Sequence, residues 1–422
     1  MTTAGGRSLW HHPDFRNLWA AQTISLIGSQ VTFLALPLTA IAVLDASPAE
    51  IGVLTALGSL PALLVGLPAG AVVDRRRRRP ILVGADLGRA ALLALVPIAW
   101  ALDALSLGLL LAVALLNGLL GLFFDVAYQA LLPALLTRDR LVEGNSRLET
   151  SRTAAEIAGP GLAGWLIHVS TAPLAIAVDA ASYVASALFL GRIRAQEPPP
   201  ARLEAGSRLW DEIWVGVGAV FGDPRLRALA GGKGLLGLFN AMLEAVFFLF
   251  IARDLGVGPG LLGLVFAVGS VGFAVGSLLP DPVARRIGVG RATVAALALV
   301  AASDLLVPLA SGSLVVVLPL LVAAQLFFGI GLTVFNVNAV SLRQSIVAGH
   351  LQGRASGTMR LMGAALVPMG ALLGGVLGEV IGLRATLVVA AGGELTAAIW
   401  LWRSPLRAVR TLPVEAENGG AA

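Results

Sequence analysis

The stretch from residue 66 to residue 89, GLPAGAVVDRRRRRPILVGADLGR, decides the fold of this chain. A hydrophobic segment runs into Asp74, five consecutive arginines follow at 75–79, and Pro80 leads into a second hydrophobic segment. A soluble core would not bury such flanks around such a charge cluster, because each buried charge would need a partner. Two membrane helices joined by a very short turn in water accommodate both features.

The composition of the whole chain points the same way. Of the 422 residues, 57% are hydrophobic and only 13% are charged, and the mean hydropathy is +0.85. Soluble domains carry about one quarter charged residues, so the composition predicts a polytopic membrane protein. The apolar runs are long and unbroken rather than alternating, which predicts an all-α protein and not a barrel. The absence of cysteine excludes disulfides, thiol catalysis and cysteine-ligated metals.

A membrane-spanning helix needs about 20 apolar residues, and about twelve segments meet that length. We predict spans at 17–44, 50–72, 80–101, 105–135, 150–168, 172–191, 228–251, 260–281, 290–311, 313–340, 358–379 and 383–402. With the N-terminus inside, the inside segments hold nearly all arginines, and the outside loops hold only Arg253 and Arg384. This imbalance predicts that both termini are cytoplasmic, and it makes the pI near 10.7 a feature of topology rather than of nucleic-acid binding.

The longest hydrophilic stretch separates six predicted spans from six. We therefore predict an N-terminal six-helix bundle at 1–191, a cytoplasmic linker at 192–226, a C-terminal six-helix bundle at 227–404 and a cytoplasmic tail at 405–422. Gly66 and Gly70 recur as Gly272 and Gly276 at an offset of 206 residues, which favours a duplicated unit. The linker segment 207–220, SRLWDEIWVGVGAV, is either an amphipathic helix on the membrane surface or an ordinary connection.

The charged turn is a candidate gate on the cytoplasmic side. Gly66 and Gly70 are spaced for close helix packing, and Asp74 ends the helix beside arginines that can pair with it. The predicted gate residues are Gly70, Asp74, Arg75, Arg78, Arg79, Asp86 and Arg89. The alternative is that the arginines only set topology.

Ionisable and polar residues at membrane depth are costly, and by default they line a cavity or pair with one another. Lys233, Asn240 and Glu244 are spaced seven and four residues apart, which places them on one helical face. A matching uncharged face occurs in the first span. The predicted cavity residues are Gln22, Ser25, Ser29, Thr32, Lys233 and Asn240.

Proton coupling needs a carboxylate that binds a proton from one side and releases it to the other. Our candidates are Glu244, Asp179 and Asp125, although a structural pairing role is an alternative for each, including an ion pair of Glu244 with Lys233. Asp304 and Glu394 occur as single acids in the ninth and twelfth spans. His11 and His12 have no further ligand nearby, so we expect no metal site.

Several motifs resemble the major facilitator superfamily (MFS). The residues Gly70, Asp74, Arg75, Arg78 and Arg79 look like its loop signature, with Arg77 where a second glycine is usual. Gly159, Pro160 and Gly164 resemble its antiporter motif, with Ala163 in place of one glycine. The runs FRNLW at 15–19, FFD at 123–125, QALLP at 129–133 and GRA at 353–355 are similar to the multidrug, macrolide and siderophore efflux group.

The resemblance implies about twelve helices in two bundles and export of amphipathic compounds by proton antiport with alternating access. It also implies a bacterial inner-membrane location and no cofactor beyond the proton gradient, and we expect a monomer that binds no nucleic acid. No phosphate-binding glycine loop or nucleophile elbow occurs, so we expect neither ATP hydrolysis nor an enzyme. The alternatives are a lipid or lysophospholipid transporter of the same fold and a non-transporting membrane sensor.

Overall fold

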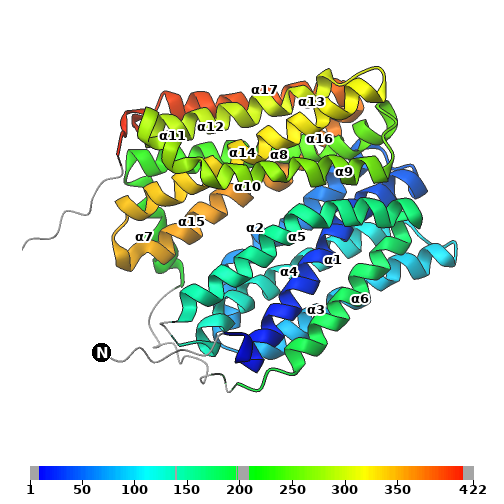
Figure 1. The fold of residues 1–422 in the computed structure, drawn as a ribbon, viewed down its shortest axis with the longest axis horizontal. Coiled ribbons are helices and arrows are strands. Elements are labelled where there is room, and N and C mark those ends of the chain that lie inside the picture. The colour runs from blue at the N-terminus through cyan, green and yellow to red at the C-terminus, as the bar shows by residue number, and fades with distance from the viewer. Residues whose placement is uncertain (1–8, 138–139, 196, 198–208, 412–422) are drawn as a thin grey trace, which may run out of the picture. The chain divides into compact units, whose positions relative to one another are not determined.

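The computed structural model describes residues 9–137, 140–195, 197 and 209–411, and in these residues the chain is helical with no strand (Figure 1). The α-helices are α1 (Pro13–Leu44), α2 (Pro48–Asp74), α3 (Arg78–Ala101), α4 (Leu107–Leu135), α5 (Leu141–Val169), α6 (Ala172–Gly191), α7 (Leu209–Phe221), α8 (Pro224–Leu249), α9 (Pro259–Gly269), α10 (Val271–Leu278), α11 (Pro280–Ile287), α12 (Val289–Asp304), α13 (Leu306–Leu309), α14 (Leu314–Ile346), α15 (Gln352–Ala365), α16 (Val367–Val380) and α17 (Leu383–Trp402). Short helical turns at Leu9–His11, Phe250–Asp254, Gly349–Leu351 and Pro405–Ala408 complete the set.

Each predicted span coincides with a helix or with two consecutive helices. Three spans that we predicted as single helices are interrupted, at Ser270 between α9 and α10, at Leu305 between α12 and α13, and at Leu366 between α15 and α16. At two of these breaks a proline, Pro308 or Pro368, lies in the turn that follows, and proline lacks the N–H that would continue the helix ladder.

Eleven helical segments of the described chain are long and apolar enough to cross a membrane. Helix α5 is absent from that set because its first half is charged, although it is 29 residues long. It begins at Leu141 rather than at the predicted residue 150, and it continues through Pro160 without interruption. Counted with α5, the structure agrees with the prediction of about twelve spanning helices.

Side chains cap the helix ends where the chain re-enters the polar region. His12 Nδ1 accepts a hydrogen bond from Phe15 N at 3.2 Å at the start of α1, so this imidazole has a capping role. Ser106 and Thr171 cap α4 and α6 in the same way. Such caps satisfy backbone donors that would otherwise be unpaired at a helix N-terminus.

The helices fall into two compact units, which we describe separately. Unit 1 comprises Met1–Ala46, Leu57–Arg202 and Gly258–Ala267. Unit 2 comprises Ser47–Ala56, Leu203–Val257 and Val268–Ala422. Each unit thus includes a short segment from the other half of the chain, and the division at the central linker stays a prediction.

Each unit has its own apolar core. In unit 1, α6 packs on α1 and α3, and the core includes Phe15, Leu82 and Leu131. In unit 2, α8 packs on α16 and α17 and α12 packs on α14, around a core that includes Leu297 and Phe335.

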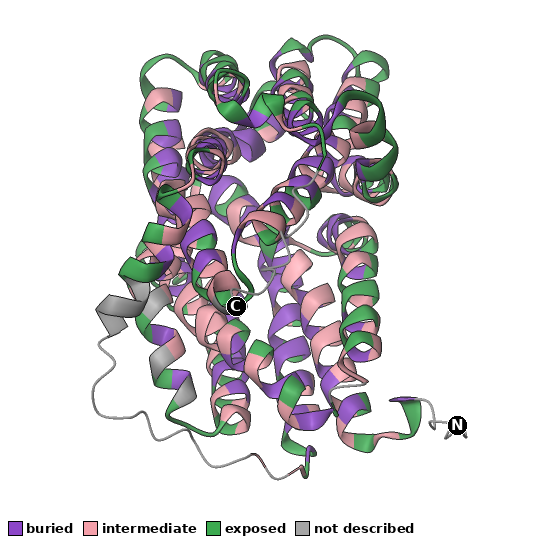
Figure 2. Ribbon diagram, turned by 90° about the vertical axis from the view of Figure 1, so that its left-hand side faces the viewer, coloured by how far each residue is buried: buried purple, intermediate pink, exposed green. Residues whose placement is uncertain are grey.

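Buried and exposed residues alternate along the helices (Figure 2), and large apolar side chains are among the exposed ones. Val315 is 83% exposed, Leu278 76% and Leu102 71%. A water-facing surface would make this arrangement unfavourable, whereas contact with acyl chains makes it stabilising.

The linker helix α7 is present, but the side chains of residues 209–213 lie outside the described residues. Gly216 of α7 lies against the backbone of Arg354 in α15, where an added Cβ would approach the Arg354 carbonyl oxygen to 2.8 Å. Helix α7 therefore packs on unit 2, and its position at a membrane surface stays a prediction.

Candidate functional site

A buried carboxylate, Asp179 of α6, lies at the centre of a polar cluster in unit 1. Its side chain is fully buried and accepts hydrogen bonds from Thr32 of α1 and, at 2.9 Å, from Ser182 Oγ. Gly28 of α1 permits this approach, because a Cβ there would overlap Ser182 and the Asp179 carboxylate. The predicted candidate Asp179 is therefore held between α1 and α6 by two hydroxyl donors.

Arg89 of α3 is the cation of this cluster. Its guanidinium lies 4.0 Å from the centre of the Tyr183 ring, and its Nε donates to Asn117 Oδ1 at 3.2 Å. The Tyr183 hydroxyl in turn hydrogen-bonds Ser29 of α1 at 2.8 Å. A cation over an aromatic face is stabilised by the ring quadrupole, and more strongly where water is excluded.

Three carboxylates lie within electrostatic reach of Arg89, namely Asp86, Asp125 and Asp179. Asp86 is fully buried beside Ser186, and its carboxylate oxygens have no hydrogen bond of normal geometry in the described chain. Asp86 and Asp179 are the two buried members, and Arg89 alone cannot neutralise both in a medium of low dielectric constant, so their charge state depends on bound protons.

This arrangement places Asp86 and Arg89 apart from the charged turn. They lie eight and eleven residues beyond Arg78, which is about 12 and 16 Å along α3. The structure brings them to Asp179 and Tyr183 instead, and their predicted role in a gate gains no support from this geometry.

The uncharged face of α1 is also turned into unit 1. Ser25 and Thr32 are buried, and Ser29 and Gln22 are partly buried. Ser29 and Thr32 hydrogen-bond side chains of α6, whereas Gln22 Oε1 is buried without a hydrogen-bond partner among the described residues. Their prediction as substrate-contacting residues is not tested.

Asp125 of α4 is exposed, and Arg89 and Arg152 are the cations that act on it. Arg152 also pairs with Glu156 at 2.9 Å and with Glu149 at 3.9 Å along α5. Asp125 thus links the Arg89 cluster to the charged first half of α5.

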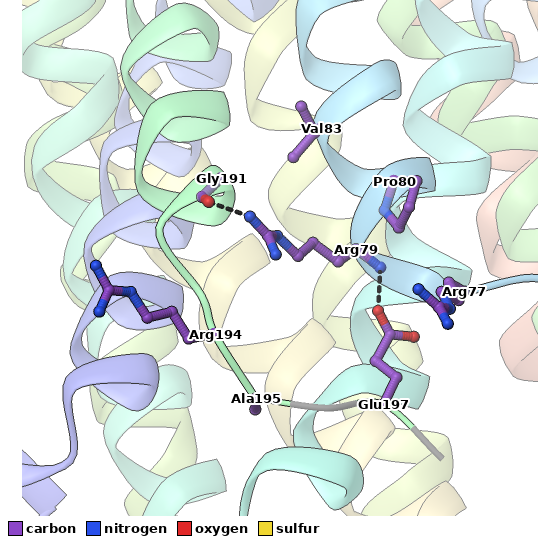
Figure 3. A pocket seen from close by; sticks show the side chains of 8 residues that line it. All are labelled: Arg77, Arg79, Pro80, Val83, Gly191, Arg194, Ala195 and Glu197. Atoms are coloured by element: carbon purple, nitrogen blue, oxygen red, sulfur yellow. Dashed lines mark hydrogen bonds between the residues drawn. The ribbon is translucent and has the colours of Figure 1, made fainter. Parts of the chain in front are cut away.

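The charged turn between α2 and α3 is hydrogen-bonded to residues at and just beyond the end of α6. The carboxylate of Glu197 accepts hydrogen bonds from the backbone N–H groups of Arg78 at 2.5 Å and Arg79 at 2.8 Å (Figure 3). The Arg79 side chain donates to the carbonyl oxygens of Leu190 at 3.2 Å and of Gly191. A negative group at a helix N-terminus is favourable, so Glu197 stabilises the start of α3.

The remaining gate residues fit the prediction less closely. The side chain of Asp74 lies outside the described residues, and Arg75 is exposed. A Cβ added at Gly66 or Gly70 would meet no described atom within 4 Å, so the tight packing predicted there is not seen in the described chain. A cavity of about 550 Å³ adjoins the turn and is lined by Arg77, Arg79, Arg194 and Glu197 among others.

The Gly-Pro segment of α5 makes close backbone contacts. A Cβ at Gly164 would lie 2.5 Å from the Cα of Gly263 in α9, and a Cβ at Gly263 would lie 2.8 Å from the Pro160 carbonyl oxygen. Gly159 packs against Gln30 of α1. The small residues therefore allow α5 to approach two other helices of unit 1, as small residues do at membrane helix interfaces.

Glu244 of α8 in unit 2 is partly buried and has no hydrogen-bond or ion-pair partner among the described residues. The alternative of an ion pair with Lys233 is wrong. The two residues are eleven positions apart on one helix, about 16 Å along its axis, and no carboxylate of the described chain lies within ion-pair distance of Lys233.

Two acids that the sequence presented as single residues meet in unit 2. Asp304 of α12 and Glu394 of α17 lie close enough to act on each other, and Asn240 of α8 lies beside Glu394, but neither Glu394 oxygen has a hydrogen bond of normal geometry among the described residues. Both carboxyl groups are buried, at 5% and 1% exposure. They are 90 positions apart in the sequence, so only the packing of α12 on α17 brings them together.

A second cavity of unit 2, of about 440 Å³, lies between α8, α14 and α15. Its polar lining consists of Lys233, Asn240, Asn336 and Arg360, and Phe328, Leu332 and Phe335 are among its apolar residues. The structure thus brings two predicted cavity residues, Lys233 and Asn240, to the wall of an actual cavity.

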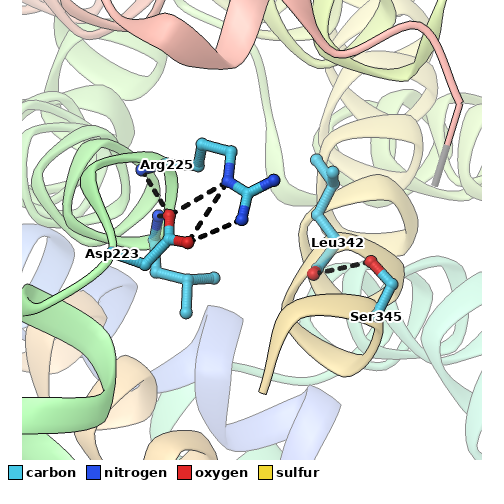
Figure 4. Close-up of polar contacts among 5 residues, drawn as sticks. Asp223, Arg225, Leu342 and Ser345 are labelled. Carbon is cyan, nitrogen blue, oxygen red and sulfur yellow. Dashed lines mark hydrogen bonds and ion pairs between the residues drawn. The ribbon is translucent and has the colours of Figure 1, made fainter. Parts of the chain in front are cut away.

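Outside the spans, Asp223 begins α8 in a compact polar contact (Figure 4). Its carboxylate accepts the backbone N–H of Arg225 at 2.7 Å and the Arg225 guanidinium at 2.6 Å. The hydrogen-bonded Arg225 guanidinium holds the pKa of the Asp223 carboxyl below its usual range.

Comparison with known proteins places the chain in a family. The model of the Major Facilitator Superfamily matches residues 18–249 and 229–421. The chain belongs to the major facilitator superfamily. It is therefore a multi-pass membrane transporter by family, and the predicted MFS fold is confirmed.

Among curated proteins, the multidrug efflux pump Tap of Mycolicibacterium fortuitum is 30% identical over 388 residues, covering 88% of this chain and 90% of that protein. Macrolide efflux protein A of Streptococcus pyogenes is 26% identical over 180 residues, covering 43% of this chain and 44% of that protein. The resemblance to multidrug and macrolide efflux proteins is thereby confirmed.

Solved structures support the same fold. A bacterial homologue of the iron transporter ferroportin in an inward-facing state matches with a TM-score of 0.75 at 16% identity, covering 94% of this chain and 99% of that chain. The nucleoside transporter NupG matches with a TM-score of 0.70 at 16% identity, covering 92% and 98%. At such identities the match concerns the fold alone.

Proposed function

We propose that this MFS protein is a secondary active transporter that exports amphipathic small molecules in exchange for protons. The observation that carries the proposal is the 30% identity to a multidrug efflux pump over 88% of the chain. The direction of transport and the broad substrate class follow from that relationship, and the driving force follows from the acids at membrane depth.

The Arg89 cluster supports proton coupling. Two fully buried carboxylates, Asp86 and Asp179, share Arg89, and Asp125 lies within reach of both Arg89 and Arg152. When one carboxylate takes up a proton, its attraction for Arg89 is lost and the guanidinium is drawn toward another. Uptake and release of a proton therefore alter contacts among α1, α3, α4 and α6, which is what a proton-driven conformational change requires.

Glu244 is the corresponding candidate in unit 2. It is a carboxylate at membrane depth without a counterion in the described chain, a position that favours proton binding over a structural role. We place the protein in the bacterial cytoplasmic membrane with both termini inside, as the arginine distribution indicates.

A whole-cell assay tests the proposal. Cells that express the protein are loaded with erythromycin, ethidium or the anionic amphiphile 11-(dansylamino)undecanoate, and efflux is followed with and without a protonophore. We expect faster efflux of at least one compound than in cells with an empty vector, and loss of the difference when the protonophore is added. Efflux equal to that of the empty vector for the whole panel, or efflux indifferent to the protonophore, would contradict proton-driven export.

A further inference from the structure

The charged side chains that line the cavity of unit 2 are both cations. Lys233 of α8 and Arg360 of α15 line it, and Arg343 of α14 lies close enough that both arginines act on Lys233. Among the described residues, the charged side chains that act on Lys233 and on Arg343 are arginines. Like charges this close raise the free energy of the unit unless something neutralises them.

Neither Lys233 nor Arg343 forms an ion pair with a carboxylate of the described chain. The Nε of Arg343 is buried and has no hydrogen-bond partner among the described residues. A buried guanidinium donor without an acceptor is costly, and an acceptor from outside the described residues would lower that cost.

The lysine is held in place by its surroundings. A Cβ added at Gly363 of α15 would lie 2.8 Å from Lys233 Cε, so the lysine stem runs along the glycine. Gly237, one turn further along α8, approaches the carbonyl oxygen of the same glycine. The close contact of α8 with α15 therefore holds the lysine stem beside Gly363, which lines the same cavity.

The rule that basic residues in loops set membrane orientation does not explain the position of Lys233. Residues that set orientation lie in loops, whereas Lys233 is nine residues into α8, about 14 Å along the helix, and is partly buried. Glu394, the acid beside the lining residue Asn240, is sealed from a ligand at 1% exposure.

We propose that this cavity binds the anionic head group, a carboxylate or phosphate, of an amphipathic ligand. Lys233 in the lining and Arg343 beside it neutralise the head group, and the amides of Asn240 and Asn336 offer hydrogen bonds to it. Phe328, Leu332 and Phe335 provide the apolar wall for the rest of the molecule. The proposal rests on the proposed export function and gives that function a substrate class.

The test uses the purified full-length protein in detergent and a fluorescent pair of probes. The anionic probe is 11-(dansylamino)undecanoate, and the neutral control is its methyl ester. We expect the wild-type protein to bind the anion at least tenfold more tightly than the ester. Lys233→Met and Arg343→Gln each weaken binding of the anion by about tenfold and leave the ester unchanged, because a charge-assisted contact is lost.

Two further variants control for charge and folding. Lys233→Arg keeps the cation and retains most of the affinity. Arg291→Gln removes an exposed arginine of α12 that does not line the cavity, and it leaves both affinities unchanged. Equal binding of anion and ester by the wild-type protein, or equal losses in Lys233→Met and Arg291→Gln, would overturn the proposal.

Competition identifies the source of the head group. Displacement of the probe by phosphatidylglycerol in mixed micelles, but not by inorganic phosphate, supports a lipid ligand. Displacement by inorganic phosphate alone supports a soluble phosphate compound, and both results support an anion site. If proton-dependent export persists while the probes show no charge preference, this inference is overturned and the proposed function stands. If binding is charge-selective but no proton-dependent export occurs, the anion site stands and the proposed function is overturned.

Discussion

The hydroxyl of Thr32 donates a hydrogen bond to the carboxylate of Asp179 and so joins α1 to α6 inside unit 1. Ser182 donates to the second oxygen of the same carboxylate, and Arg89 acts on it from α3. Side chains from three helices, α1, α3 and α6, therefore act on the Asp179 carboxylate.

Asp179→Asn is expected to abolish proton-coupled transport while leaving membrane insertion intact. The amide is similar in size and can still accept from one hydroxyl, but it carries no charge for Arg89 and cannot bind and release a proton. Efflux and proton counterflow in proteoliposomes measure the effect, and we expect a loss of tenfold or more in the coupled rate.

Asp281→Asn is the matched control for that substitution. Asp281 pairs with Arg285 at 3.5 Å outside the spans, where the two side chains are 87% and 81% exposed, and such pairs contribute little. We expect transport within about twofold of the wild type. Normal transport by Asp179→Asn, or equal losses in the two variants, would remove Asp179 from the coupling mechanism.

Gly164→Ala is expected to impair transport by forcing α5 away from α9. The new Cβ lies 2.5 Å from the Gly263 Cα, and overpacking of this kind costs about 1–3 kcal/mol. Thermal unfolding in detergent and efflux rates check this, and Gly191→Ala is the control because a Cβ there meets no described atom within 4 Å. A Gly164→Ala protein as stable and active as Gly191→Ala would show that the contact is unimportant.

Glu197→Gln tests the cap on α3. The glutamine side chain retains an acceptor for the N–H groups of Arg78 and Arg79 but loses the charge that favours a helix N-terminus. We expect a loss of about 0.5–1 kcal/mol in stability at low ionic strength, which becomes smaller in high salt because exposed charges are screened. A loss that is independent of salt would mean that the contact acts through shape rather than charge.

Asp223 gives a prediction on pH. Because the Arg225 guanidinium lowers the folded-state pKa of Asp223, its contribution to stability is fully present above the unfolded value, near 3.9, and is lost as the pH falls through the folded value. Asp223→Asn should therefore be less stable than the wild type by about 1 kcal/mol at pH 7. The difference should shrink as the pH is lowered from 4 toward 2, as measured by unfolding in detergent. A difference that stays constant over that range would contradict the role given to the charge.

The sequence predicted the helices well because hydrocarbon imposes one rule along the whole chain. A segment of sufficient apolar length in lipid must be helical, so the bounds of α4 and α6 follow closely from composition alone. The sequence did not predict the break at Leu366, before Pro368, inside the span expected at 358–379. The residues on both sides of the break are apolar, so hydropathy gives no sign of it.

The candidate site could be predicted only in part. Helical spacing placed Lys233 and Asn240 on one face, and a cavity lies there. Contacts between distant helices were not predictable, because nothing in the sequence pairs Asp304 with Glu394 or Arg89 with Tyr183. The sequence did hold one signal for the Asp304–Glu394 pair. An acid at membrane depth with no cation nearby in the sequence needs another partner, and these two acids are such residues.

Proton-driven export is tested most directly in liposomes that contain the purified protein and have an acidic interior. We predict that erythromycin, or the compound of the whole-cell panel that is exported best, accumulates inside while protons leave. We also predict that nigericin, which collapses the proton gradient, abolishes the accumulation. Accumulation that is the same with and without the gradient would contradict the account.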